Sequence, residues 1–117
     1  MVAMNIEQTR IGNVVVVTVQ GVIKLNESAK QLSNHLQHVL ETGSGSVLVD
    51  LSKVDEVDST GLGELVGYLQ LFSKQGRDLA VAKPTEKIRR LFEFMNLDKV
   101  LPIFDNCEQA VAALERK

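Results

Sequence analysis

A hydrophobic strand gives way to an amphipathic helix across Val47-Leu48-Val49-Asp50-Leu51 and Asp58-Ser59-Thr60-Gly61-Leu62-Gly63. The β-branched residues of the first segment predict a strand over residues 46–51, and a short acidic loop follows it. The second segment predicts the start of a helix that runs from Ser59 or Thr60 to Lys74. The apolar residues of this helix fall on one stripe, made of Leu62, Leu65, Val66, Leu69 and Phe72.

Two strands and a helix are predicted before this strand–helix unit. Residues 4–10 predict an edge strand, and the β-branched run 14–19 predicts a second strand that Gly21 ends. Apolar residues at three- and four-residue spacing then predict a helix over residues 27–42, with Asn26 as its N-cap. Because only a short turn joins the first two strands, they should form an antiparallel pair at one edge of the sheet.

Two strands and two helices are predicted after the unit. Residues 79–82 predict a fourth strand, and residues 100–104 a last strand that Pro102 confines to an edge. A third helix should begin near Thr85, and Asn106 with Gln109 resembles a capping box for the last helix. The residues expected to face inward from these helices are Ile88, Leu91, Phe92, Met95, Ala110, Val111 and Leu114.

This order predicts one α/β domain over residues 1–117. Helices separate the later strands, so the sheet of about five strands should be mixed but mostly parallel, with four helices covering it. At 117 residues and 44% apolar content, the chain is long enough for one core. No internal repeat or linker interrupts it.

Composition narrows the classes of function. The net charge is −2 and no lysine or arginine block stands beside aromatic residues, which argues against nucleic acid as a partner. The chain opens with no charged-then-apolar leader, and no apolar run approaches the roughly 18 residues of a membrane span. The single Cys107 excludes an intramolecular disulfide and suits a reducing compartment, and its simplest role is a small buried hydrophobe. These features together predict a cytoplasmic protein.

Ser59 is the candidate functional residue. Aspartate, serine and threonine are the residues that cap helix N-termini, so capping alone is the plainest explanation of the Asp58-Ser59-Thr60 string. Gly61, Gly63 and Gly67, however, lie in the first two turns of the same helix, where each costs about 0.5–1 kcal/mol relative to alanine. They would leave the helix start bare enough for another protein to approach. Tight packing of helix on sheet could account for one or two of them.

The charges around Ser59 indicate what a phosphate would do there. A helix N-terminus accepts a phosphate well, through unpaired N–H groups and the positive end of the helix dipole. A phosphoserine would add about −1.5 to −2 charge beside Asp58, with Asp55, Glu56 and Glu64 nearby. Like charges across an interface cost several kcal/mol. The pattern therefore favours a binding domain controlled by phosphorylation of Ser59, with no enzymatic activity of its own.

Other constellations are weaker. Asp50 ends a strand as the acceptor aspartate of a response regulator does, but Gln20-Gly21-Val22 lacks the acidic pair that would hold magnesium. No histidine is placed to activate Ser59 as a nucleophile, and neither a P-loop nor a dinucleotide fingerprint occurs. His35 and His38 lack partners for a metal site and should be solvated. The basic residues Lys83, Lys87, Arg89 and Arg90 predict a solvated helix face or a docking surface for an acidic partner.

The string Val57-Asp58-Ser59-Thr60-Gly61-Leu62-Gly63 after Val-Leu-Val-Asp-Leu-Ser closely resembles the anti-sigma factor antagonists of the STAS domain family (sulfate transporter and anti-sigma factor antagonist). The resemblance extends over nearly the whole chain, through Gly21, Asp50-Leu51-Ser52, Gln75-Gly76 and Ile88-Arg89-Arg90-Leu91-Phe92. In that family the residue directly after the aspartate accepts the phosphate. The resemblance therefore assigns this role to Ser59 and makes Thr60 a less favoured target.

The resemblance implies partner switching in bacterial transcription regulation. The unmodified protein would bind an anti-sigma factor that is also a serine kinase, and so free a sigma factor. The kinase would then phosphorylate Ser59 and release the complex, and a metal-dependent serine phosphatase would restore the binding form. ATP and metal would belong to these partners, so this chain itself needs no cofactor. The partner-binding residues would be Asp58, Ser59, Thr60, Gly61, Leu62, Gly63 and Lys24.

One departure from the family bears on the partner. Many antagonists follow the glycine of strand two with an acid, an aliphatic residue and an aspartate, whereas this chain has Gly21-Val22-Ile23-Lys24. Lys24 should lie near the serine loop, where it could pair with Asp58 or with a phosphate. Two alternatives stay open: a STAS subunit of a membrane lipid-transport ABC complex, and a partner-switching phosphoprotein with an output other than a sigma factor. The oligomeric state is open between a monomer and a weak dimer.

Overall fold

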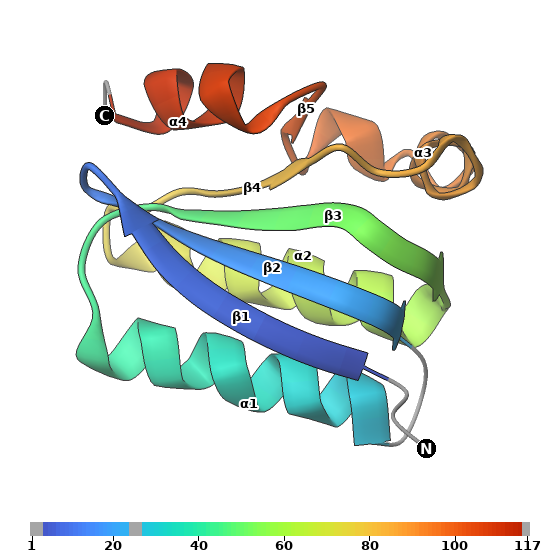
Figure 1. The fold of residues 1–117 in the computed structure, drawn as a ribbon, viewed down its shortest axis with the longest axis horizontal. Coiled ribbons are helices and arrows are strands. Elements are labelled where there is room, and N and C mark those ends of the chain that lie inside the picture. The colour runs from blue at the N-terminus through green and yellow to red at the C-terminus, as the bar shows by residue number, and fades with distance from the viewer. Residues whose placement is uncertain (1–3, 24–26, 116–117) are drawn as a thin grey trace.

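The domain is a five-stranded sheet with four α-helices (Figure 1). The structure, a computed structural model, describes residues 4–23 and 27–115, so the expected N-cap Asn26 and Lys24 lie outside the described residues. The elements in chain order are β1 (Met4–Ile11), β2 (Val14–Ile23), α1 (Glu27–Thr42), β3 (Val47–Val57), α2 (Ser59–Lys74), β4 (Leu79–Ala82), α3 (Glu86–Phe94), the 3₁₀ turn η1 (Leu97–Lys99), β5 (Ile103–Phe104) and α4 (Cys107–Glu115).

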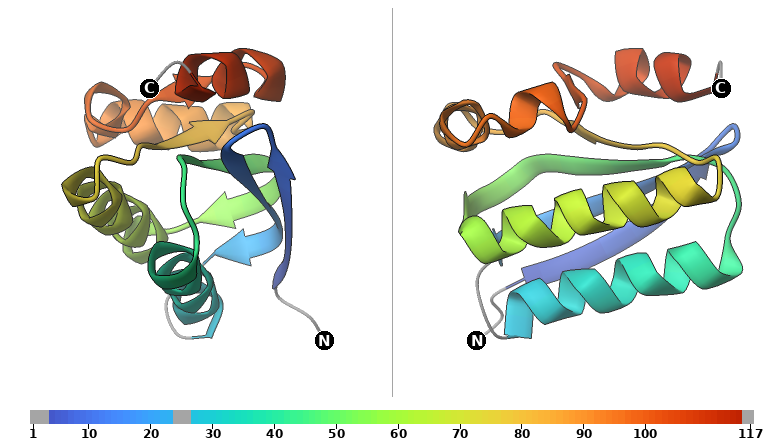
Figure 2. Two further views of the ribbon diagram at one scale, coloured as in Figure 1. Left: turned by 90° about the vertical axis from the view of Figure 1, so that its left-hand side faces the viewer. Right: turned by 180° about the vertical axis from the view of Figure 1, so that it is seen from behind.

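The strands lie in the order β1-β2-β3-β4-β5. β1 pairs with β2 antiparallel, and the other three pairs are parallel. This confirms the mixed, mostly parallel sheet with one antiparallel edge pair. α1 and α2 lie side by side on one face and α4 crosses the other (Figures 1 and 2). Because the loops between parallel strands and following helices gather at one edge, the end of β3 and the start of α2 lie there together.

The core has a large part and a small part on opposite faces of the sheet. The large cluster joins β2 and β3 residues such as Val17 and Val49 to Leu36 of α1 and Phe72 of α2. α3 contributes Ile88 and Phe92 to this same cluster. The small cluster lies under α4, where Ala110, Val111 and Leu114 pack on Val14, Val16, Leu48, Ala80 and Ala82. Alternating side chains of the central strands thus pack into the core on both faces of the sheet, as expected of strands covered on both sides.

β2 and β3 are longer than the sequence pattern predicts. Gly21 does not end β2, because its positive φ of 113° and two register shifts let the strand bend and continue to Ile23. β3 continues beside it, with Val22 opposite Glu56 and Ile23 opposite Val57. The expected acidic loop after Leu51 is therefore mostly strand. Its charged side chains gave no sign in the sequence of this strand pairing, in which Val54 and Val57 are buried.

Two further predictions at the C-terminal end are corrected. The last strand is only Ile103–Phe104, because Val100 closes η1 and Leu101 turns into the core. Met95 does not face inward: α3 ends at Phe94, and Met95 is 37% exposed as its C-cap residue. The cap of α4 is confirmed on its Asn106 side, where Oδ1 accepts the backbone N–H of Gln109 at 2.8 Å.

Candidate functional site

Ser59 is the first residue of α2, and the turn that presents it is fixed on both sides. The backbone N–H of Asp58 donates to the carbonyl of Ile23 at 3.0 Å, which fastens the turn to the end of β2. The Asp58 carboxylate caps α2 by accepting the N–H of Gly61 at 3.0 Å. Because Asp58 serves as the cap, the Ser59 hydroxyl is not needed for that purpose. Ser59 is exposed, and its side chain makes no hydrogen bond within the described part of the chain.

The three glycines of α2 differ in their surroundings. Gly61 is buried, and a Cβ there would lie 2.7 Å from Cγ2 of Ile23 and 2.8 Å from Cγ2 of Val57. Gly63 and Gly67 would meet nothing within 4 Å. Packing of helix on sheet therefore explains Gly61 alone. Gly63, which is exposed, leaves the surface one turn beyond Ser59 without a side chain.

The other residues of the expected site divide into exposed and buried groups. Ser59 and Gly63 are exposed, Asp58 and Thr60 are half-buried, and Gly61 and Leu62 are buried. Gly61 and Leu62 thus position the helix start on the core, whereas Ser59 faces outward. Asp55 is exposed and Glu56 and Glu64 are half-buried on either side of the turn. The residue pairs at the end of β2 and β3 bring Ile23 next to Val57, so the end of β2 lies beside the serine turn. The expected position of Lys24 lies outside the described residues.

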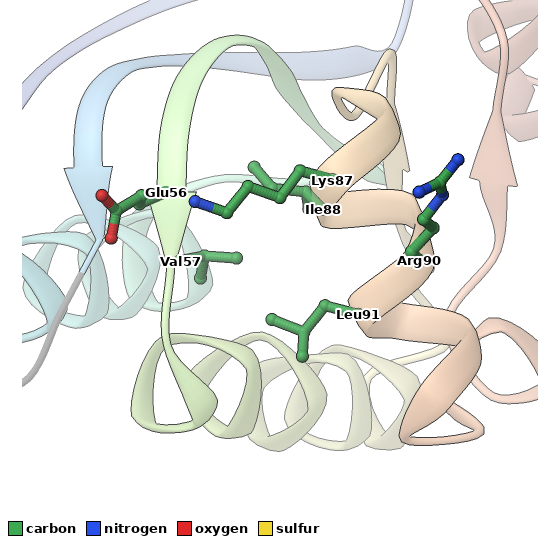
Figure 3. Close-up of a pocket in the computed structure, with 6 residues that line it drawn as sticks. All are labelled: Glu56, Val57, Lys87, Ile88, Arg90 and Leu91. Atoms are coloured by element: carbon green, nitrogen blue, oxygen red, sulfur yellow. The ribbon is translucent and has the colours of Figure 1, made fainter.

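A pocket of about 260 Å³ lies on the α3 side of this turn. It is lined by Glu56, Val57, Lys87, Ile88, Arg90 and Leu91. In Figure 3 the Lys87 side chain extends from α3 toward the end of β3, while the Arg90 guanidinium points to the other side of the helix. The sequence pattern did not predict this pocket, because it depends on the extension of β3 to Val57. An isolated stretch of charged residues gives no sign that it ends a strand.

Asp50, whose position invited a response-regulator interpretation, is engaged inside the protein. Its carboxylate is buried, accepts the N–H of Ser52 at 2.9 Å and lies 3.6 Å from Sγ of Cys107. Lys83 Nζ lies 3.9 Å from Oδ2 of Asp50. Burial, and then the nearby Asp50 charge, raises the pKa of the Cys107 thiol, so the thiol is protonated at neutral pH. The contact between Cys107 and Asp50 therefore links α4 to the sheet.

His38 is exposed, as predicted for both histidines, but His35 is half-buried, so the prediction that it is solvated is wrong. In the basic helix, two arginines are paired within the chain. His35 Nε2 is 2.7 Å from Oε1 of Gln8, and burial followed by the charge of His38 lowers the pKa of His35. Arg90 pairs with Glu86 one turn away at 3.2 Å, and Arg89 pairs with Asp105 at 2.9 Å. Among the residues that the structure describes, no three potential metal ligands gather at one place. No described helix is long and apolar enough to cross a bilayer.

The sheet and its helices define an α/β domain that presents an exposed hydroxyl at the start of α2, and comparison with known proteins identifies its family. The family model described as "Mlab, STAS domain" matches residues 6–103. The chain belongs to the STAS domain family. This confirms the resemblance noted in the sequence.

Relatives within the family carry the name of anti-sigma factor antagonists. One from Thermotoga maritima is 33% identical over 78 residues, covering 67% of this chain and 69% of that protein. A crystal structure of a T. maritima protein of the same name superimposes with a TM-score of 0.87 at 25% identity, covering 94% of both chains. The antagonist SpoIIAA, whose structure is known in unphosphorylated and phosphorylated forms, superimposes with TM-scores of 0.72 and 0.71. At 14% and 15% identity, SpoIIAA supports the fold alone.

Proposed function

We propose that this protein is an anti-sigma factor antagonist whose partner binding is switched by phosphorylation of Ser59. The observation that carries the proposal is the exposed hydroxyl at the first residue of α2, which has no hydrogen bond to any described residue, with Asp58 already serving as the cap. The antagonist names of its relatives support the same class. The protein would act by binding in the cytoplasm, with no catalytic step of its own.

The geometry explains how a phosphate could change binding without unfolding the domain. A phosphate on Ser59 would lie at the N-terminus of a 16-residue helix, where the dipole favours negative charge by about 0.3–1 kcal/mol. Since the hydroxyl makes no hydrogen bond within residues 4–23 and 27–115, its modification removes none of the contacts described there. The new charge would stand among Asp55, Asp58 and Glu64, and would repel a partner surface built to fit an unmodified serine.

Attack by a serine kinase requires access, and the surface around Ser59 provides it. Gly63 adds no side chain on the next turn, and the open space at Gly67 extends this bare strip along α2. In the proposed cycle an anti-sigma factor kinase binds the unmodified turn, transfers the γ-phosphoryl group of ATP to the Ser59 oxygen and releases ADP. A metal-dependent phosphatase hydrolyses the phosphoserine to serine and inorganic phosphate, which restores binding.

The test is phosphoryl transfer to the purified full chain. Candidate anti-sigma factor serine kinases of the source organism are each incubated with the chain and radiolabelled ATP. We expect label on the wild type and on Thr60→Ala, and none on Ser59→Ala. Label that persists undiminished on Ser59→Ala would overturn the assignment.

A binding measurement with the same kinase completes the test. Ser59→Asp should weaken binding, and its melting temperature should stay close to that of the wild type. A Ser59→Asp variant that is largely unfolded would show instead that the serine is structural. The alternative function is a permanent contact with a transporter ATPase. It predicts that the wild type and Ser59→Ala bind this ATPase equally well and that the kinase labels neither protein. Another output of the same phospho-switch would give the same label with no sigma factor released.

A further inference from the structure

The pocket between the end of β3 and α3 opens beside the serine turn. Its floor is apolar, because Val57, Ile88 and Leu91 line it. Val57 is both part of that floor and two residues before Ser59, so the pocket lies within a few residues of the serine turn. The pocket and the serine turn therefore form one continuous surface.

One side of α3 extends this surface. Lys87, Leu91 and Phe94 are spaced four and three residues apart, which places them on one helical stripe. Leu91 is half-buried in the pocket, and Phe94 is 85% exposed, the largest exposure among the large apolar side chains of the described residues. Exposure of so large an aromatic side chain next to an apolar pocket is typical of an anchor position in protein interfaces.

The charges on this stripe indicate the chemistry of the partner. Arg89 and Arg90 are engaged by Asp105 and Glu86 within the chain. Lys87 forms no ion pair within the part of the chain that the structure describes, and it extends across the pocket (Figure 3). The serine turn itself is acidic, through Asp55 and Asp58. The surface thus offers acidic groups at the turn and, at α3, a pocket with an apolar floor. Glu56, Arg90 and Lys87 are the charged residues that line this pocket, and Arg90 is already paired with Glu86.

We propose that this pocket receives an apolar side chain of the same partner protein that binds the serine turn, and that a carboxylate beside that side chain pairs with Lys87. The inference rests on the proposed function and adds the chemistry of the partner's contacting segment. The apolar side chain would pack on Val57, Ile88 and Leu91, with Phe94 at the edge. Phosphorylation of Ser59 would act next to this contact and would place a second anion within the same interface.

The proposal is tested with the kinase that labels Ser59. Its affinity is measured by titration calorimetry for the full chain and for Lys87→Glu and Phe94→Ser. The matched controls are Lys74→Glu and Ile11→Ser, which make the same kinds of change at the end of the molecule away from the start of α2 (Figure 1). We expect each pocket variant to bind about tenfold more weakly, and each control to bind like the wild type. The Lys87→Glu complex should also depend less on salt.

A crosslink identifies the segment itself. Phe94→p-benzoylphenylalanine is irradiated in the complex, and the attached kinase peptide is identified by mass spectrometry. A peptide with an apolar residue next to an aspartate or glutamate supports the proposal. A basic peptide, or a second copy of this chain, overturns it, as do pocket variants that bind like the wild type. If the kinase neither binds nor labels the wild type, the proposed function itself is wrong. If it binds and labels the wild type but the pocket variants bind equally well, only the proposed pocket contact is wrong.

Discussion

Gly61 and Ile23 are packed so closely that a Cβ on the glycine would lie 2.7 Å from Cγ2 of the isoleucine. The carbonyl oxygen of Ile23 would lie 3.3 Å from the same Cβ, while its hydrogen bond from Asp58 holds the turn in place. The first turn of α2 therefore lies directly on the end of β2. This contact sets the position of Ser59 relative to the sheet.

Alanine at Gly61 and at Gly63 should have opposite effects on stability. Gly61→Ala forces side chains of the core to move, and overpacking of this kind costs about 1–3 kcal/mol. Gly63→Ala enters open space, where alanine favours the helix over glycine by about 0.5–1 kcal/mol. Urea unfolding of both variants measures the two changes. Effects of the same sign would contradict the packing described for Gly61.

The element order was predictable from the sequence because hydrophobic periodicity and caps are local signals. α1, α2 and β4 begin and end where the pattern places them. The extension of β2 and β3 was not predictable, because it arises from pairing between two segments that each look irregular. Gly21 reads as a strand end, and only the partner strand shows that its backbone bends and continues. The pocket beside Val57 depends on that extension.

The cap of α2 should stabilise the domain, and the candidate phosphoacceptor should not. Asp58→Ala removes the acceptor of the Gly61 N–H and should lower the free energy of unfolding by about 1 kcal/mol. Ser59→Ala removes a hydroxyl with no hydrogen bond in the described residues, so we expect a change within about 0.5 kcal/mol. Thermal and urea unfolding measure both. A large loss in Ser59→Ala would point to a structural serine, while Asp58→Asn should retain most of the cap.

The position of Ser59 at the start of a helix was predictable from residue identity, but its surroundings were only partly predictable. The Asp-Ser-Thr-Gly string marks a helix start, which is a local signal. Only the hydrogen bonds of the structure show that Asp58 caps the helix and that the Ser59 hydroxyl is left exposed. The pocket between α3 and the end of β3 could not be predicted, because Lys87 and Glu56 are distant in sequence and no pattern relates them.

The contact between Cys107 and Asp50 predicts that the domain loses stability at alkaline pH. The pKa of Cys107 is raised in the folded protein above its ordinary value of 9.0, first by burial and then by Asp50. Between the unfolded and folded pKa values the unfolded chain binds fewer protons, so stability falls as pH rises through this interval. We expect the wild-type free energy of unfolding to decline above about pH 9.

Cys107→Ser separates the thiol from other alkaline effects. A serine hydroxyl can still donate to Asp50 but does not ionise in this range, so the variant should show a shallower decline than the wild type above pH 9. Urea unfolding at a series of pH values under reducing conditions measures both curves. The thiol of the native wild type should also react slowly with a disulfide reagent at pH 8, since only the thiolate attacks. Equal slopes for the two proteins would show that Cys107 does not contribute.

Arg77 is buried and joins the last turn of α1, the loop before β3 and the end of α2. It donates from Nε to the carbonyl of Gly45 at 2.7 Å, and from its terminal nitrogens to the carbonyls of Leu40 and Val39 at 3.3 and 3.4 Å. Its guanidinium carbon lies 4.6 Å from the centre of the Phe72 ring. The arginine thus satisfies carbonyls in the last turn of α1 and stacks on a core residue of α2.

Arg77→Lys should therefore destabilise the domain even though it keeps the charge. A lysine carries a single ammonium group, which cannot reach the three carbonyls together or stack its plane on Phe72. Since hydrogen bonds to charged groups are worth about 1.5–3 kcal/mol, we expect a loss of about 2–3 kcal/mol in urea unfolding. Arg10→Lys is the matched control, because exposed Arg10 makes one side-chain hydrogen bond within the described residues, to the carbonyl of Ser44 at 3.2 Å, and should lose less than about 1 kcal/mol. Equal losses in the two variants would show that the fork geometry of Arg77 is unimportant.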